Sequence, residues 1–91
     1  MRLTVEFSGR MKKDFDLAKR RGKDMEKIRV VIEKLANLEP LEPKYCDHGL
    51  SRNYEGCREC HIAPDWLLVY KVKEAELILL LMRTGSHSDL F

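Results

Sequence analysis

Two apolar runs decide how the chain folds: Trp66-Leu67-Leu68-Val69-Tyr70 and Leu77-Ile78-Leu79-Leu80-Leu81. Both are nearly continuous and of strand length, which is typical of strands buried at the centre of a sheet and covered on at least one face. The charged break Lys73-Glu74-Ala75-Glu76 is short enough for a hairpin, and Pro64-Asp65 separates the first run from an earlier candidate strand. The three strands are expected over residues 57–62, 66–72 and 77–83.

The N-terminal half is expected to add one strand and two helices. Alternation of apolar and polar residues predicts a half-buried strand over residues 2–7. Ser8 and Asp24 offer N-cap oxygens to helices that reach Arg20 and Leu38, each with apolar residues at helical spacing. The resulting order β-α-α-β-β-β predicts a two-layer α+β fold, with a helix hairpin on one face of a mostly antiparallel sheet and the other face free. The polar, turn-rich residues 44–56 predict an irregular connection.

Length and composition bound the class of protein. A chain of 91 residues has room for one domain, expected over residues 1–91. Its hydrophobic fraction of 44% and charged fraction of 35% are typical of a soluble globular protein, and no apolar run approaches the roughly 18 residues of a membrane span. The first residues lack the apolar core of a signal peptide, so we expect a cytoplasmic protein with no membrane partner.

Charge is unevenly distributed along the chain. Residues 1–44 carry 12 Lys and Arg against 8 Asp and Glu, whereas residues 45–91 carry 5 against 7. The basic helix pair therefore favours an acidic partner segment, although a solvated helix face also accounts for any single lysine.

All three histidines, His48, His61 and His87, lie in the C-terminal half beside polar or turn residues. If the last three strands are neighbours, His61, Asp65 and Arg83 lie at the same edge of the sheet, where they can converge on one cleft. A single histidine would more often be a satisfied polar residue, but this grouping favours a catalytic set.

Such a set suits cleavage of a phosphodiester in RNA. One imidazole or carboxylate takes the proton of the 2′-hydroxyl, a second imidazolium protonates the leaving 5′-oxygen, and the Arg83 guanidinium neutralises the pentacoordinate phosphorane. This route needs no metal and no cofactor, because the nucleophile belongs to the substrate. Phe91, Tyr54 and Tyr70 are candidates for stacking on splayed bases, with core packing the more frequent role of Tyr70.

The cysteines allow a different interpretation. Cys46, His48, Cys57 and Cys60 have a tolerable spacing for a structural zinc ion, with reduced unligated thiols as the simpler alternative. Cys57-Arg58-Glu59-Cys60-His61 also fits the attachment sequence of c-type haem, but that chemistry requires export, for which no signal is seen.

Several segments together resemble a known family. The segments are Asp47-His48-Gly49-Leu50, residues 54–70 with their Arg58-Glu59-Cys60-His61 and Pro64-Asp65-Trp66 elements, and Arg83-Thr84-Gly85-Ser86-His87-Ser88-Asp89-Leu90-Phe91. They are similar to the YafQ-like branch of the RelE/ParE superfamily of bacterial toxins, over nearly the whole chain.

The resemblance implies a microbial RNase fold of the RelE kind, ribosome-dependent cleavage of messenger RNA and neutralisation by a cognate antitoxin, which we expect to be acidic and partly disordered. His87 would be the general acid, and His48 or Asp65 would help to activate the 2′-hydroxyl. The implied catalytic set is His48, His61, Asp65, Arg83 and His87. The expected substrate-binding set is Phe91, Glu59, Tyr54 and Arg58.

The same superfamily leaves a second function open. Toxins of the ParE kind share this fold and act on gyrase without cutting RNA, and fold alone does not separate the two. The clustered histidines favour the ribonuclease, because binding to gyrase does not require them.

Overall fold

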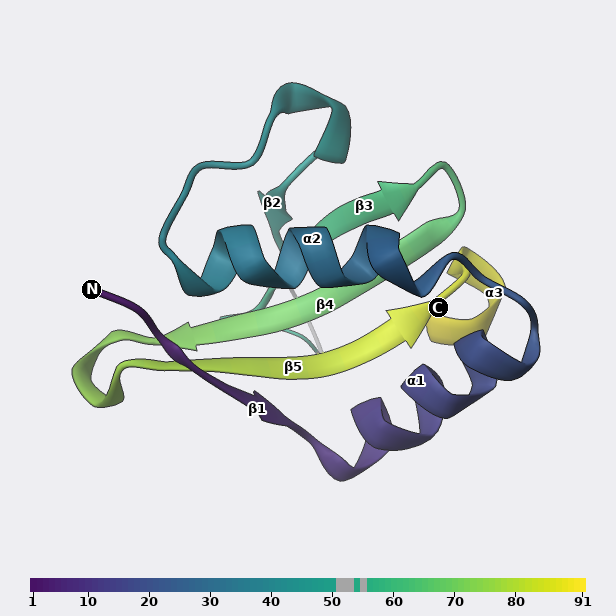
Figure 1. Ribbon diagram of the computed structural model, residues 1–91, viewed down its shortest axis with the longest axis horizontal. Coiled ribbons are helices and arrows are strands. Elements are labelled where there is room, and N and C mark those ends of the chain that lie inside the picture. Colours follow the sequence, from purple (N-terminus) through teal and green to yellow (C-terminus); the bar gives the residue numbers. More distant parts are fainter. Residues whose placement is uncertain (51–53, 55) are drawn as a thin grey trace.

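Five strands form one sheet in the computed structural model, which describes residues 1–50, 54 and 56–91 (Figure 1). The strand order is β1-β5-β4-β3-β2, with three antiparallel pairings and one parallel pairing, between β1 and β5. The prediction of a mostly antiparallel sheet is thus confirmed. The strands are β1 (Thr4–Phe7), β2 (His48–Gly49), β3 (Arg58–Ala63), β4 (Trp66–Lys73) and β5 (Ile78–Gly85). The helices are α1 (Gly9–Arg20), α2 (Met25–Ala36) and α3 (His87–Leu90), with short 3₁₀ turns η1 (Pro43–Tyr45) and η3 (Glu74–Glu76).

The two long helices begin where their N-cap residues predict. The Ser8 hydroxyl accepts a hydrogen bond from the Met11 amide at 2.9 Å, and the Asp24 carboxylate accepts one from the Glu26 amide at 3.1 Å. The second helix ends at Ala36, two residues earlier than predicted, because Leu38 takes a left-handed backbone conformation with φ 60°.

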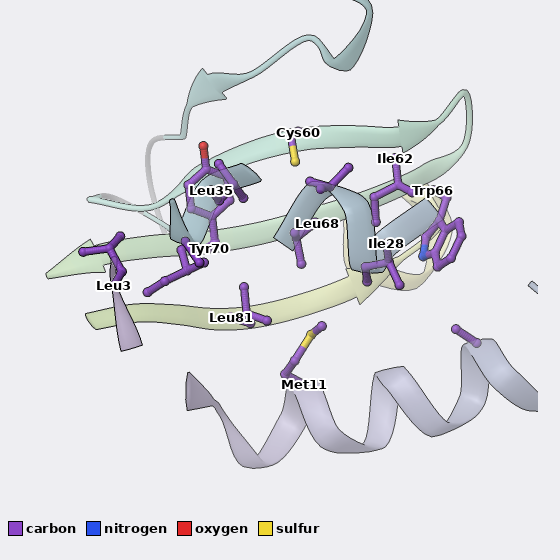
Figure 2. Packing of buried hydrophobic residues seen from close by; sticks show 14 residues of the cluster. Leu3, Met11, Ile28, Leu35, Cys60, Ile62, Trp66, Leu68, Tyr70 and Leu81 are labelled. Atoms are coloured by element: carbon purple, nitrogen blue, oxygen red, sulfur yellow. The ribbon is translucent and has the colours of Figure 1, made fainter. Parts of the chain in front are cut away.

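The main core lies between the helices and one face of the sheet (Figure 2). Met11 of α1 and Ile28 of α2 are fully buried there against Leu68 and Leu81 of the two central strands. The two apolar runs, residues 66–70 and 77–81, therefore occupy the centre of the sheet, as predicted.

The opposite face of the sheet is not free, which corrects one expectation. Leu67 and Val69 of β4 are fully buried on that face in a second cluster with Cys57 and with Leu90 of α3. A helix immediately after β5 covers apolar side chains that would otherwise face water. In Figure 1, α3 lies at the end of β5, at the same end of the sheet as the connection from β3 to β4.

The predicted irregular connection also contains regular structure. Pro43–Tyr45 form a 3₁₀ turn, and His48 and Gly49 pair with Glu59 and Arg58 as the edge strand β2. Residues 51–53 and 55 of that connection lie outside the described residues. Among the helices of the described residues, none combines the length and the apolar character that crossing a membrane requires.

Candidate active site

A buried carboxylate lies between two histidines at the β2–β3 edge. His48 is the cross-strand partner of Glu59, and His61 follows two residues later on the same face of β3. The His48 Nε2 atom lies 3.2 Å from Glu59 Oε1, and the His61 Nε2 atom lies 3.6 Å from the same oxygen. Only 7% of the Glu59 side chain is exposed, against 51% for His48. Glu59, expected only to bind substrate, is therefore the centre of the cluster.

His87 and Asp65 form a second pair. The Asp65 carboxylate accepts the backbone N–H of His87 at 3.0 Å and lies 2.7 Å from its ring Nδ1 atom. The backbone hydrogen bond from His87, and then the side-chain contact, hold the pKa of Asp65 below its usual range. Asp65 is thus an ionised acceptor, so the Nδ1 atom of His87 carries a proton and Nε2 is the nitrogen directed away from this contact.

The Glu59-centred cluster and the His87–Asp65 pair are in contact through one imidazole ring of each. The rings of His61 and His87 are edge to face, with centroids 5.7 Å apart. His48, Glu59, His61, His87 and Asp65 thus form one continuous chain of contacts from β2, β3, the β3–β4 turn and α3. His48, His87 and Asp65 are largely exposed, so this active-site cluster lies on an open surface.

The position of His87 depends on how α3 is attached. Ser86 caps α3 and forms a capping box with Asp89, whose carboxylate also accepts a hydrogen bond at 2.8 Å from Arg21, the residue that follows α1. The Arg21 contact, with the Ser86 backbone N–H, lowers the pKa of Asp89 to about 2. A Cβ atom on Gly85 would lie 2.9 Å from the Cβ of Asp89. Glycine is therefore required at this position by the close approach of α3.

Arg83 has other partners than the histidines. Its Nε atom donates to Asp14 of α1 at 2.8 Å, and both side chains are largely buried. Asp14 also accepts the Thr84 backbone N–H at 3.2 Å. The hydrogen bond to Asp14 is the largest cause that raises the pKa of Arg83, and a further contribution comes from the Tyr54 hydroxyl. Arg83 therefore joins β5 to α1 and lies beside Tyr54.

Two aromatic residues of the expected binding set meet. The rings of Tyr54 and Phe91 are edge to face with centroids 5.7 Å apart, and 64% of Phe91 is exposed. The Phe91 backbone N–H donates to the His87 carbonyl oxygen at 2.9 Å. An exposed aromatic ring is thus held one helical turn from the His87–Asp65 pair.

Arg58 and Tyr70 are not part of the active-site cluster. Arg58 lies next to Glu59 in β3, so its side chain leaves the strand on the opposite side. Its Nε atom donates to Asp47 at 3.3 Å, and the buried Tyr70 hydroxyl donates to the same carboxylate oxygen at 2.6 Å. Burial is the main cause that raises the pKa of Tyr70, followed by the contact with Asp47. These three residues anchor the chain immediately before His48.

The cysteines do not form the zinc site that their spacing allows. Cys60 is fully buried in the core beneath the helices, whereas Cys57 belongs to the cluster on the opposite face of the sheet. Two side chains on opposite faces cannot ligate one ion, so the zinc-module interpretation is wrong for Cys46, His48, Cys57 and Cys60. Burial raises the pKa of the Cys60 thiol to about 12, which keeps it protonated.

A groove of about 630 Å³ between α2 and β3 borders the active-site cluster. Of the cluster residues, only His61 lines it. The cluster is therefore defined by side chains on an open face of the sheet and not by an enclosing cavity.

The chain is similar over nearly its whole length to one family of bacterial toxins. A family model described as "Bacterial toxin of type II toxin-antitoxin system, YafQ" matches residues 3–91. The mRNA interferase toxin YafQ of Escherichia coli strain K12 is 41% identical over 88 residues, which cover 96% of this chain and 94% of the relative. The structure of the E. coli DinJ-YafQ toxin-antitoxin complex matches with a TM-score of 0.89 and 39% identity, over 100% of this chain and 99% of that one. A metal-bound toxin from Helicobacter pylori matches with a TM-score of 0.92 and 45% identity, over 98% and 99% of the two chains.

Proposed function

The chain belongs to the YafQ family of bacterial type II toxins, and from that premise we propose that it is an mRNA interferase, an endoribonuclease that cleaves messenger RNA on the ribosome. The observation that carries the proposal is the unbroken line of contacts from His48 to Asp65, which places three imidazoles and two carboxylates on one open surface. Cleavage by attack of the 2′-hydroxyl requires an acid and a base at such a surface, and the substrate supplies the nucleophile.

His87 is the general acid in this mechanism. Asp65 fixes the backbone N–H and the Nδ1 atom of His87 at the same time, so the ring keeps one orientation and Nε2 is the atom that gives a proton to the leaving 5′-oxygen. Asp65 is the residue that orients the acid.

The base lies at the other end of the active-site cluster. His48 or Glu59 takes the proton of the 2′-hydroxyl, because their contact of 3.2 Å lets the proton pass between the Nε2 atom and the carboxylate. His61 stands between the two ends and contacts both, 3.6 Å from Glu59 and ring to ring with His87. A phosphate placed over His61 would therefore be in reach of the acid and of the base.

Substrate positioning falls to residues around the active-site cluster. The exposed Phe91 ring, supported by Tyr54, offers a platform for an unpaired base. Arg83 lies beside Tyr54 and is largely buried against Asp14, and we propose that its planar guanidinium also reaches a phosphate oxygen of the bound RNA. The active-site cluster is open and does not enclose a substrate by itself. It suits an RNA that another macromolecule already positions, such as messenger RNA bound in a ribosome. We place the toxin in the cytoplasm, where its substrate is made.

A cognate antitoxin is the expected protein partner. The related YafQ is found in a toxin-antitoxin complex with DinJ, and the N-terminal half of this chain carries an excess of four basic residues. An acidic, partly disordered antitoxin that orders against the helix pair fits that charge.

Controlled expression followed by mapping of messenger RNA ends tests the nuclease. The wild type produces new 5′ ends within coding regions and arrests growth, whereas His87→Ala lowers cleavage by about a hundredfold to ten-thousandfold through loss of the acid. Ser88→Ala is the matched control, since Ser88 is exposed in the same short helix. Growth arrest by a folded His87→Ala protein would contradict the proposal. Arrest without new RNA ends would instead favour a gyrase poison of the ParE kind.

A further inference from the structure

We propose that a basic groove along α1 holds the RNA strand on the 3′ side of the cleaved bond. This assignment rests on the proposed function, because it gives a place to one half of the substrate. The groove has a volume of about 400 Å³ and lies between α1, the end of β5 and α3 (Figure 1). We refer to it as the α1 groove. Its basic lining residues are Arg10, Arg21, Lys23 and Arg83.

The α1 groove follows one face of the helix. Asp14 and Arg21 come four and eleven residues after Arg10, which is about one and three helical turns, so the three side chains lie on one side of α1. Arg10 is in the first turn and Arg21 follows the last residue of the helix, so the groove extends for about 16 Å along the helix axis. An elongated groove of this kind suits an extended strand.

The carboxylates that line the α1 groove are already paired with cations. The pairs are Asp14 with Arg83, Asp89 with Arg21, and Asp65 with His87. A protonated His87 balances the charge of Asp65, so the charges of the three pairs cancel. The two other cations of the lining, Arg10 and Lys23, therefore give the groove a net positive charge.

Arg10 and Lys23 keep the capacity to bind a phosphate. The Arg10 Nε atom is 3.8 Å from Asp14, and 66% of the Arg10 side chain is exposed. Lys23 is also exposed, and it forms no ion pair within the part of the chain that the structure describes. Its ammonium lies over the Trp66 ring, 5.8 Å from the centroid, a contact that holds the cation without neutralising its charge.

The position of Lys23 determines which part of the RNA enters the α1 groove. After the contacts with His87, the charge of Lys23 is a further cause that lowers the pKa of Asp65, so Lys23 is near the acid end of the active-site cluster. His87 gives its proton to the leaving 5′-oxygen, which belongs to the nucleotide on the 3′ side of the cut. The strand that passes His87 is thus the 3′ strand, and its phosphates reach Lys23 first and Arg10 last.

Binding is tested with an RNA that cannot be cut. A fluorescein-labelled 2′-O-methyl oligonucleotide lacks the nucleophile and keeps the backbone charge, and anisotropy measures its affinity for the full chain at several salt concentrations. Lys23→Ala and Arg10→Ala should each weaken binding several-fold. Each should also reduce the slope of log affinity against log salt by about 0.7, the value for one phosphate contact with a single strand. Lys23→Arg should keep the wild-type slope.

Lys19→Ala is the matched control. Lys19 is exposed on α1, and its ammonium lies over the Phe15 ring at 5.1 Å, so this substitution removes the same charge and the same kind of contact outside the groove. Its salt slope should equal that of the wild type. Equal losses from Lys19→Ala and Lys23→Ala would reflect net charge alone and overturn the proposal. If Lys23→Ala weakens binding of the cognate antitoxin and leaves RNA affinity unchanged, the groove belongs to the antitoxin and the proposal is again overturned.

Cleavage of messenger RNA on ribosomes tests the direction of the strand. Neutral methylphosphonate linkages replace single phosphates on either side of the mapped cut. At the most sensitive position on the 3′ side, the replacement should lower wild-type cleavage about tenfold, the effect of one charge-assisted hydrogen bond. It should cost Lys23→Ala almost nothing more, since the contact is already lost. A replacement on the 5′ side should cost both proteins equally. If Lys23→Ala is as sensitive as the wild type on the 3′ side, the assignment is wrong.

The two possible failures can be distinguished. A wild type that cuts no messenger RNA on ribosomes contradicts the proposed function. The binding measurements use an RNA that cannot be cut, so they decide independently whether Lys23 and Arg10 contact the RNA backbone.

Discussion

Tyr70 shows how a residue outside the active-site cluster can govern it. Its buried hydroxyl donates to Asp47, and the next residue along the chain is His48, whose ring faces Glu59. The β2 strand is only two residues long, so its own pairing with β3 gives it little support. The hydrogen bond from Tyr70 to Asp47 therefore fixes the position of the neighbouring His48.

Tyr70→Phe should lower cleavage about tenfold and the free energy of unfolding by about 1 kcal/mol, the usual contribution of one hydrogen bond. Steady-state kinetics and chemical denaturation measure the two effects. Asp47→Ala should cost more, because it also removes the acceptor of Arg58, and the double variant should be no worse than Asp47→Ala alone, since Tyr70→Phe then removes no further bond. Tyr45→Phe is the control, because the Tyr45 hydroxyl makes no hydrogen bond among the described residues. Additive losses would show that the two residues act independently.

Arg83 has a structural role that sequence alone did not reveal. It forms a largely buried ion pair with Asp14, a charged residue within the apolar stripe of α1. Removal of one member of such a pair leaves an uncompensated charge and costs about 3 kcal/mol or more.

Arg83→Ala should therefore reduce the free energy of unfolding by about 3 kcal/mol and also reduce cleavage per folded molecule about a hundredfold through lost stabilisation of the phosphorane. Asp14→Asn separates the effects, because it breaks the ion pair but leaves the guanidinium in place. We expect it to destabilise the protein while folded molecules still cleave RNA. Thermal unfolding and single-turnover cleavage are the measurements. If both variants retain cleavage per folded molecule, Arg83 has no part in the reaction.

At the scale of elements, α3 carries His87, the proposed acid, and is the part of the fold that the sequence predicted least well. A four-residue helix is too short to be stable by itself, so periodicity does not detect it. Ser86 and Asp89 nevertheless have the spacing of a capping box, which was the available indication. The helix exists because Leu90 completes the second apolar cluster and Arg21 holds Asp89.

Gly85→Ala tests this attachment. The added methyl group would lie 2.9 Å from the Asp89 Cβ, so α3 must move, at a cost typical of overpacking, about 1 to 3 kcal/mol. Cleavage should fall more than about tenfold, since small displacements of reacting groups cost that much or more. The chemical shifts of the His87 ring report the movement. Gly9→Ala is the matched control, because a Cβ there meets no atom within 4 Å. Equal activity of the two variants would mean that α3 tolerates the shift.

At the scale of the whole molecule, sequence reasoning found the layers and missed the connections between them. The caps at Ser8 and Asp24 and the apolar runs of β4 and β5 are local patterns, and the structure confirms them. The parallel pairing of β1 with β5 and the edge strand β2 depend on contacts between distant residues, which periodicity does not encode. For the same reason the contacts of Glu59 with His48 and of Asp14 with Arg83 appear only in three dimensions.

Charge on the helix pair predicts how the antitoxin binds. Lys12 and Lys13 are exposed on α1, so reversing both to glutamate should weaken antitoxin affinity at least tenfold and reduce its dependence on salt. Calorimetry at two salt concentrations gives both quantities. Lys71→Glu with Lys73→Glu is the control, with the same charge change at exposed positions of β4. If both pairs of substitutions weaken antitoxin binding equally, the affinity depends on the net charge of the toxin and not on the surface of α1.

The parallel pairing of β1 with β5 has a consequence for the order of synthesis. β5 lies between β1 and β4 and is the only strand that pairs with β1 among the described residues. β1 is synthesised first and β5 last of the five strands, so β1 has no partner until β5 has been made. His87 follows β5, and α3 cannot dock before that strand is in place. A nascent chain therefore does not yet hold the proposed acid in place, and the messenger RNA that encodes this toxin is not exposed to the proposed cleavage until the domain has emerged.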